Sequence, residues 1–372
     1  MDVCETETCL RAHRDLVRAA IQAPTPDNNQ PWKFVSSGDR LQIFLDPERA
    51  LASDVNSMFD LIGIGAAIEN GVIAGRQLGH RSEVDYAVEF HGSPRPDQGL
   101  LAATLRLIGE SGVSEPDPLY EQMALRGTNR SLYSTKRVES AVLDKLAQET
   151  HEFPEVQVDW VDDRTRIGEF AKLIAASDRL RFEYRPFHQE LFEQLRFTVE
   201  EAESTRDGLD VRTLELPPGV ASIIHWLRYW PRMQWINRLG LGSMLTFPSW
   251  LSVRKSGAIG VLSLSEASTE EFLQGGRAFQ RIWLAASAAG LAMQPLGSLP
   301  IFIGQLRQLE GRNLHARHKQ LASQLQAKLE QLVPATVGRT LQLAFRTGYA
   351  KSPPVRSLRR SEDDVWEYPD ND

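Results

Sequence analysis

The hydrophobic and polar positions of the chain follow two different periods, which predicts a mixture of helices and strands. Residues 10–22 have helical spacing and are followed by Pro24, and residues 58–80 form a longer helical segment that is rich in small side chains. Alternating patterns predict four strands around these helices, at residues 31–37, 40–46, 82–90 and 99–108. A first structural unit is therefore expected to span residues 1–118.

The rest of the chain, residues 119–372, is expected to form a second unit. Between about 180 and 256 its sequence is helical and irregular, which indicates an insertion into this unit. The acidic end of the chain, residues 361–372, is expected to be frayed. Further helices and strands are predicted at about 120–125, from 139 onward, and at 156–161, 257–265, 269–291 and 340–349.

The two long small-residue helices of these units are related by an internal repeat. Sliding the chain by 211 positions brings four pairs of identical residues into register within one helical segment each. Small residues along a helix let another backbone approach closely, so we expect both helices to pack at a shared central interface. The pairs are Gly65 with Gly276, Ala67 with Ala278, Ala74 with Ala285, and Gly79 with Gly290.

Composition narrows the class of protein. A chain of 372 residues, 42% of them hydrophobic, can bury a substantial core. The formal charge of −7 argues against a nucleic-acid surface, because phosphate binding needs a positive field. Cys4 and Cys9 alone cannot build a disulfide framework or a four-ligand metal site, so the expected compartment is the cytoplasm. Neither a secretory signal nor a membrane span is expected.

The loop APTPDNNQPWKF, residues 23–34, has the composition of a binding loop. Its prolines, Pro24 among them, stiffen the backbone, and three consecutive side chains, Asn28, Asn29 and Gln30, carry amide groups. A stiff backbone with amide groups indicates a flat ligand with polar edges.

The segment RGTNR places Arg126, Thr128 and Arg130 at alternating positions. In an extended backbone these side chains share one face and present two guanidinium groups and a hydroxyl, which suits a phosphate. The alternative is a solvated turn with two surface arginines.

Two further segments are candidates. Residues 294–297 are expected to form a loop directly after a helix, in which Pro295 fixes the path and Gly297 lets a ligand approach the backbone. An ordinary turn between two helices would use the same residues. A basic cluster lies near the end of the fold and comprises Arg346, Lys351, Arg356, Arg359 and Arg360. Either all of its side chains are solvated, or one of them binds a phosphate.

Residues 219–250 concentrate aromatic and basic side chains. Such a mixture is typical of a segment that rests on a membrane surface, or of a helical lid whose aromatic faces cover a planar ligand. In a chain with several special loops, the lid is the favoured interpretation. The side chains are Trp226, Tyr229, Trp230, Trp235, Phe247 and Trp250 with Arg228, Arg232 and Arg238.

Taken together, APTPDNNQPWKF, RGTNRSLY, MQPLG and GYAKSPPVR resemble motifs of the FMN-dependent nitroreductase superfamily. The resemblance implies an α+β fold with central sheets flanked by helices. Members are usually homodimers in which each flavin is held by both subunits. Here the first unit has the Gln-Pro-Trp loop but lacks the arginine segment. The second unit has the arginine segment but lacks the loop. This distribution looks like the Acg-like branch, in which one chain imitates the dimer and retains one flavin site beneath an insertion.

The resemblance also implies roles for particular residues. Arg126, Thr128 and Arg130, helped by Arg356, would bind the phosphate and ribityl end of FMN. The ribityl chain and ring edge would contact four residues of the first unit, namely Pro24, Thr25, Asn28 and Gln30. The ring near N5 would contact the loop at Pro295, Leu296 and Gly297.

The implied activity is an oxidoreductase in which NAD(P)H reduces the flavin and a small electron acceptor, such as a nitroaromatic or quinone, reoxidises it. We expect a monomer that acts as a pseudo-dimer. Two alternatives stay open: the chain holds FMN beneath the lid without turnover, or it binds no flavin and is a structural or interaction module.

Overall fold

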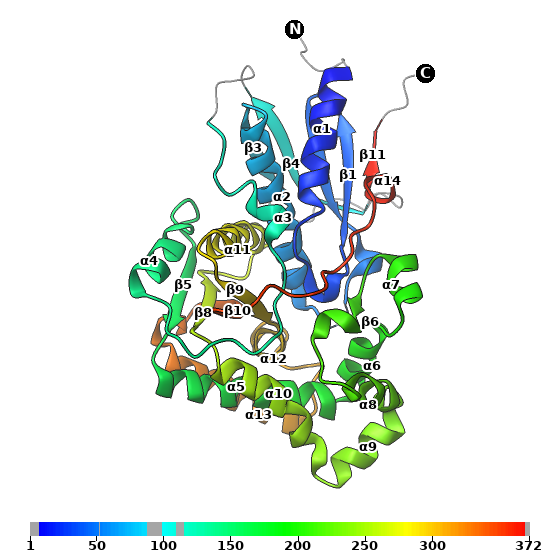
Figure 1. Cartoon of the computed structure of the whole chain (residues 1–372), viewed down its shortest axis with the longest axis vertical. Coiled ribbons are helices and arrows are strands. Elements are labelled where there is room, and N and C mark those ends of the chain that lie inside the picture. The colour runs from blue at the N-terminus through cyan, green and yellow to red at the C-terminus, as the bar shows by residue number, and fades with distance from the viewer. Residues whose placement is uncertain (1–6, 52, 88–98, 109–114, 369–372) are drawn as a thin grey trace.

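The computed structural model describes residues 7–51, 53–87, 99–108 and 115–368. Cys4 and the last four residues of the acidic tail lie outside these ranges. Two sheets and the helices around them build an α+β fold, as predicted (Figure 1). Helices and strands occur at the positions that the hydrophobic pattern predicts, with small differences at their ends.

The first sheet has the strand order β11-β1-β2-β4-β3, in which β11 (Trp366–Glu367) comes from near the end of the described residues. Strands β1 and β2 form an antiparallel hairpin, and β4 continues the antiparallel order to β3. Helix α1 packs on α2, which in turn packs against β2, β3 and β4 of the sheet. The elements are α1 (Glu7–Ala20), β1 (Trp32–Ser37), β2 (Arg40–Leu45), α2 (Met58–Gln77), β3 (Arg81–Tyr86) and β4 (Leu100–Ile108).

The second sheet has the order β5-β8-β10-β9, and all of its neighbouring strands are antiparallel. Strand β8 is buried along its whole length, which explains its continuous apolar sequence. The elements are α3 (Gln122–Leu125), α4 (Ser140–Gln148), β5 (Val156–Val161), β8 (Ala258–Leu264), α11 (Thr269–Ala288), β9 (Ala292–Leu296), α12 (Ser298–Gln308), α13 (Ala316–Leu332) and β10 (Thr340–Gly348).

The insertion between β5 and β8 is mostly helical and lies beside both sheets (Figure 1). It begins with the long helix α5, which also packs against α10, α12 and α13. Its elements are α5 (Arg164–Glu183), α6 (Arg185–Glu193), β6 (Leu195–Arg196), α7 (Val199–Thr205), β7 (Leu209–Asp210), α8 (Val220–Leu227), α9 (Trp230–Arg238) and α10 (Phe247–Arg254), with short 3-10 turns at Val211–Leu214 and Leu241–Thr246.

The expectation of a frayed tail is wrong for the described residues. After β10 the chain returns to the first sheet, forms α14 (Glu362–Val365), and adds β11 (Trp366–Glu367) parallel to β1. Trp366 is buried and its indole N–H donates to the hydroxyl of Ser36 at 3.0 Å. Burial of an aromatic side chain outweighs the acidic composition of its neighbours. This return also crosses the boundary expected at residues 118 and 119, and that division stays a prediction.

Helices α2 and α11 approach so closely that only glycine fits at their crossing. A Cβ built on Gly65 would overlap the carbonyl oxygen of Leu273, and one on Gly276 would overlap the carbonyl oxygen of Ile62. Two glycines of the internal repeat therefore face each other's helix. Helix α2 is long and apolar enough to span a membrane, but here it is buried inside the fold.

Replacing Gly65 with Ala is expected to lower the free energy of unfolding by about 3 kcal/mol, because the added methyl group overlaps backbone that cannot turn aside. Urea denaturation measures the loss. Gly304→Ala in α12 is the matched control, since its Cβ would have no neighbour closer than 3.9 Å, and it should stabilise by about 0.5–1 kcal/mol. Equal effects of the two substitutions would contradict the close crossing.

Candidate functional site

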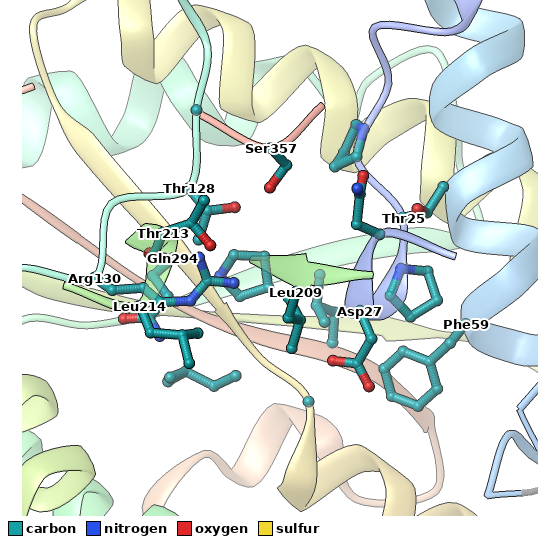
Figure 2. A pocket seen from close by; sticks show the side chains of 18 of the residues that line it. Thr25, Asp27, Phe59, Thr128, Arg130, Leu209, Thr213, Leu214, Gln294 and Ser357 are labelled. Carbon is teal, nitrogen blue, oxygen red and sulfur yellow. Dashed lines mark hydrogen bonds between the residues drawn. The ribbon is translucent and has the colours of Figure 1, made fainter. Parts of the chain in front are cut away.

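A cavity of about 500 Å³ lies where the two halves of the chain meet. Its lining includes four segments that are distant in sequence: the loop at 24–28, the RGTNR segment, the end of β9, and the returning tail at 355–359. Figure 2 shows Thr25 and Asp27 on one side of it and Thr128 and Arg130 on the other. The amide-bearing loop and the arginine segment thus converge, as the sequence motifs require.

The loop at 24–30 has an unusual backbone. Asp27, Asn28 and Gln30 have φ angles of 46°, 59° and 50°, in the left-handed region that residues other than glycine rarely adopt. This backbone conformation lowers the stability of the fold, and it persists only where the surrounding structure holds the residues in place. The loop is therefore a fixed shape at the cavity wall.

The amide groups of this loop hold it in place. The Asn28 amide donates to the carbonyl oxygen of Leu358 at 3.1 Å, and the Gln30 amide donates to that of Arg206 at 2.8 Å. The backbone N–H of Arg360 donates to Gln30 Oε1 at 2.8 Å. Gln30 is buried and does not line the cavity, whereas Pro24, Thr25 and Asn28 do. Its amide connects the loop to the tail and to the insertion.

The RGTNR segment runs along the cavity in an extended conformation. Thr128 forms a parallel bridge with Met293 of β9, and the N–H of Asn129 donates to the Met293 carbonyl at 3.0 Å. Arg126, Thr128 and Arg130 all line the cavity, as their alternating positions predict.

Three arginines gather at one end of this cavity without a carboxylate. Arg126 donates to the Gln22 carbonyl and lies over the ring of Trp283, Arg356 donates to the carbonyls of residues 124 and 125, and Arg359 donates to Asn28 Oδ1. Among the described residues none of the three forms an ion pair.

This arrangement is electrostatically costly for Arg126, because burial and neighbouring positive charges both act against its guanidinium. Burial, and then Arg359 and Arg356, hold the pKa of Arg126 well below its ordinary value. Burial also lowers the pKa of Arg359, to about 10. The Nε atoms of Arg126 and Arg359 are buried and have no hydrogen-bond partner among the described residues. Buried cations with spare donors form a site for an anion.

Arg130 has different surroundings. Its guanidinium donates to the Thr213 carbonyl at 3.1 Å, and its backbone N–H donates to Glu215 at 2.9 Å. Burial lowers the pKa of Arg130, and the carboxylates of Asp27 and Glu215 oppose that shift. Figure 2 shows Arg130 beside Gln294, Thr213 and Leu214. The cavity therefore has one end with unpaired cations and another with a compensated arginine.

The expectation of a loop at 294–297 is wrong for most of that segment. Residues 294–296 belong to β9, whose register pairs Gln294 with Arg346 and Leu296 with Ala344. A proline is tolerated because β9 is an edge strand of its sheet. Pro295, Leu296 and Gly297 nevertheless line the cavity.

The insertion covers the cavity, but its lining side chains are not the aromatic ones that the sequence predicts. Leu209, Leu214 and Leu216 line it, together with Pro248 and Ser249. None of the six aromatic side chains that the sequence singled out is among the lining residues, and four are exposed: Trp226, Tyr229, Trp235 and Phe247. The prediction of an aromatic inner face is therefore wrong.

Sequence reasoning also missed residues that α5 brings to the cavity. Asp178 and Arg181 line it, and Arg181 pairs with Asp27 of the loop at 3.1 Å. Burial raises the pKa of Asp178. Helix periodicity predicts which residues face inward but not which cavity they face, so no sequence signal marked this pair.

A second missed group supports the site from behind. Arg346 of β10 is fully buried; it donates to Gln294 Oε1 at 2.6 Å and to the carbonyls of Asn129 and Ser131, and lies over the ring of Tyr133. It thereby joins β9 to the RGTNR segment. The sequence marked Arg346 only as one member of a basic cluster. Another member, Lys351, does not line the cavity.

Asp54, shortly before α2, adds a carboxyl group to the wall, and Asp60 of α2 lies behind it. Asp54 lines the cavity and accepts the backbone N–H groups of Phe59 and Asp60. Burial raises the pKa of Asp60 to about 7, and burial followed by Asp60 raises that of Asp54. Among the described residues, no group of His, Cys, Asp and Glu side chains is arranged to hold a metal ion.

Comparison with known proteins gives two sequence relatives, and no family model matches the chain. It is 30% identical over 346 residues to an uncharacterized protein of Mycobacterium tuberculosis (strain CDC 1551 / Oshkosh), covering 93% of this chain and 47% of that protein. It is 27% identical over 188 residues to "Putative NAD(P)H nitroreductase acg" of the same strain, covering 48% of this chain and 53% of that protein. The chain spans about half the length of the curated relatives it matches.

Solved structures give weaker likenesses. The FMN-dependent nitroreductase NfnB from Mycobacterium smegmatis, in complex with NADPH, has 16% identity and a TM-score of 0.34, covering 67% of this chain and 96% of that chain. The FMN and NADPH-dependent nitroreductase NfnB from sphigopyxis sp. strain HMH has 14% identity and a TM-score of 0.38, covering 68% and 99%.

The sequence match to acg agrees with the four motifs around the cavity. The pseudo-dimer branch is a finer assignment that these comparisons do not test, and it stays a prediction. The resemblance to the nitroreductase superfamily is confirmed, and this chain is a relative of nitroreductase-like proteins.

Proposed function

We propose that the cavity binds FMN and that the chain is an FMN-dependent oxidoreductase, which takes electrons from NAD(P)H and passes them to a small acceptor such as a nitroaromatic or a quinone. The observation that carries the proposal is a group of three arginines, without a carboxylate partner among the described residues, at one end of a cavity of about 500 Å³. Arg126 is buried, Arg359 is partly buried and Arg356 is exposed. Cavities of roughly 300–1,000 Å³ are typical of cofactor and small-molecule sites.

The donor set fits a phosphate monoester. Arg126 and Arg359 have spare buried Nε–H donors, and Arg356 adds a third guanidinium to the lining. A phosphate would neutralise charges that the protein leaves uncompensated, and charge-assisted hydrogen bonds to it are about twice as strong as neutral ones. The expected helper Arg356 is thereby joined by Arg359, which is the more deeply buried of the two.

The remaining lining fits a flat polar ligand. Thr128, Pro24, Thr25 and Asn28 are proposed to contact its middle, with Gln30 acting indirectly by holding the loop. Pro295, Leu296 and Gly297 are proposed to lie against the ring, and Arg130 at the compensated end of the cavity. When bound, FMN supplies the redox chemistry, and the chain supplies orientation, charge and exclusion of water.

A single chain provides both sides of this site. Residues 22–62 line it from the first unit, and residues from 123 onward line it from the second. The close α2–α11 crossing at repeated glycines supports an origin by fusion of two related halves. We therefore propose that the protein acts as a monomeric pseudo-dimer, in the cytoplasm.

The cover of the cavity favours a second candidate, a protein that holds FMN without turnover. Leu209, Leu214 and Leu216 of the insertion line the cavity, and in this candidate they are proposed to fill the space that a nicotinamide ring needs beside the flavin. If these side chains do not move, NAD(P)H cannot stack on the ring.

One experiment separates these candidates. The purified protein is titrated with FMN, and the complex is then mixed anaerobically with NADPH in a stopped-flow instrument. The oxidoreductase proposal expects the flavin absorbance to bleach. A flavin that dithionite reduces but NADPH does not indicates sequestration, especially if Leu214→Ala restores bleaching and the exposed control Leu239→Ala does not. Absence of FMN binding would overturn both candidates.

A further inference from the structure

An exposed apolar and basic surface covers the outer end of the insertion. Of the fifteen large hydrophobic side chains exposed among the described residues, eight lie between residues 223 and 247. Trp235 is 56% exposed, Tyr229 59% and Met244 68%. The other five are Ile223, Trp226, Leu239, Leu241 and Phe247. Monomeric proteins rarely expose so many large apolar groups in one short segment without a partner.

The charge of this segment is opposite to that of the rest of the protein. Residues 216–265 contain no Asp or Glu and five basic residues, whereas the whole chain has a formal charge of −7. The segment contributes +5, so the remaining residues carry −12. None of the five forms an ion pair with a described carboxylate, and all are exposed; they are Arg228, Arg232, Arg238, Arg254 and Lys255.

The aromatic and basic groups are interleaved. The Arg232 guanidinium lies over the rings of Trp226 and Tyr229, at 5.1 and 5.5 Å from their centroids. Leu227 and Met233 are the buried positions of α8 and α9, so these helices attach to the body by one side. In Figure 1, α8 and α9 form the outer end of the insertion, and α6 lies between them and the acidic helix α7.

We propose that this surface, which comprises the eight exposed apolar residues and the five basic ones, docks on an anionic phospholipid bilayer. Trp and Tyr side chains partition to the boundary between headgroups and acyl chains, and Arg and Lys are attracted by anionic headgroups. A bilayer presents continuous negative charge and needs no pocket. A protein partner would have to place a carboxylate against each of the five cations. Within this chain, no described carboxylate pairs with any of them.

The proposal does not depend on the flavin. It predicts peripheral binding, with the apolar groups inserted at headgroup depth and no helix crossing the bilayer. The cavity lining includes Pro248, Ser249 and Ser252, which lie in sequence between Phe247 and Arg254 of the surface, so docking would bring one rim of the cavity close to the lipid.

The test is co-sedimentation of the full chain with vesicles of phosphatidylcholine alone or with phosphatidylglycerol at about a third of the lipid. We expect at least tenfold tighter partitioning to the anionic vesicles and a loss of binding at high salt, because screening weakens the attraction. Arg228→Gln/Arg232→Gln/Arg238→Gln should reduce partitioning by at least tenfold, and Trp226→Ser/Tyr229→Ser/Trp235→Ser should do the same.

A matched control removes three exposed cations elsewhere, at Arg11, Lys145 and Arg312, each changed to Gln. It should bind vesicles as the wild type does, apart from a small effect of net charge. Circular dichroism and a cooperative thermal unfolding transition verify that each variant is folded. Equal binding to neutral and anionic vesicles, equal loss in the control, or no binding by a folded wild type would each overturn the proposal. Concentration-dependent dimers that the triple aromatic variant abolishes, with no vesicle binding, would assign the surface to a second copy.

Discussion

Arg126→Met is expected to weaken FMN binding on the order of a hundredfold and, at the same time, to stabilise the ligand-free protein by about 1–2 kcal/mol. A hydrogen bond to a charged group contributes about 1.5–3 kcal/mol, and Arg126 is proposed to donate to the phosphate with a guanidinium that has no carboxylate partner. Without ligand, the same buried charge is a net cost, and an apolar side chain of similar volume removes it.

Isothermal titration with FMN and urea denaturation of the ligand-free protein measure the two effects. Arg137→Met is the control, because Arg137 is exposed and Asp162, at 2.6 Å, is its one ion-pair partner among the described residues, and it should change both quantities little. Unchanged FMN affinity in the Arg126 variant would place the phosphate elsewhere. A loss of several kcal/mol in the ligand-free protein would show that the arginine is a structural residue.

Glu69→Gln is expected to lower the free energy of unfolding by about 3–5 kcal/mol. Glu69 of α2 is fully buried and accepts from Arg277 at 2.8 Å and Arg281 at 3.0 Å, both on α11. Arg281 also pairs with Asp117 and Glu149, but Glu69 is the only described carboxylate that pairs with Arg277. Removing one partner of a buried ion pair leaves an uncompensated charge.

Chemical denaturation measures this loss, and a double substitution tests its cause. Glu69→Leu/Arg277→Met removes the whole pair and should recover part of the stability, because the cost arises from the charge left behind. FMN affinity should be unaffected, since neither residue lines the cavity. A double variant no more stable than Glu69→Gln would instead assign the loss to packing at the α2–α11 crossing.

The sequence predicted the elements well because local pattern decides them. The alternation in residues 31–37 and 340–349 and the small residues of α2 and α11 each correspond to the observed element. The predicted convergence of the Gln-Pro-Trp loop and the RGTNR segment also agrees with the cavity lining. The resemblance to a family brought these distant segments together, since local pattern has no information about contacts between them.

The failures have a common physical cause. Composition made residues 361–372 look frayed and residues 294–297 look like a loop, but packing of Trp366 against β1 and pairing of β9 with β10 override local preference. The aromatic residues of the insertion were assigned to the ligand because hydrophobicity alone does not distinguish an inner face from an outer one. Asp178 and Arg346 reach the site through tertiary contacts and have no local signal.

The route of the tail has a consequence for biosynthesis. Arg356 and Arg359 follow the last strand of the second sheet, and β11 anchors them on the first sheet by pairing with β1. On a ribosome, the residues before this stretch emerge and collapse while it is still inside the exit tunnel. The proposed phosphate site is therefore assembled only after Arg356 and Arg359 have left the tunnel, so the nascent chain would not hold its cofactor before that point.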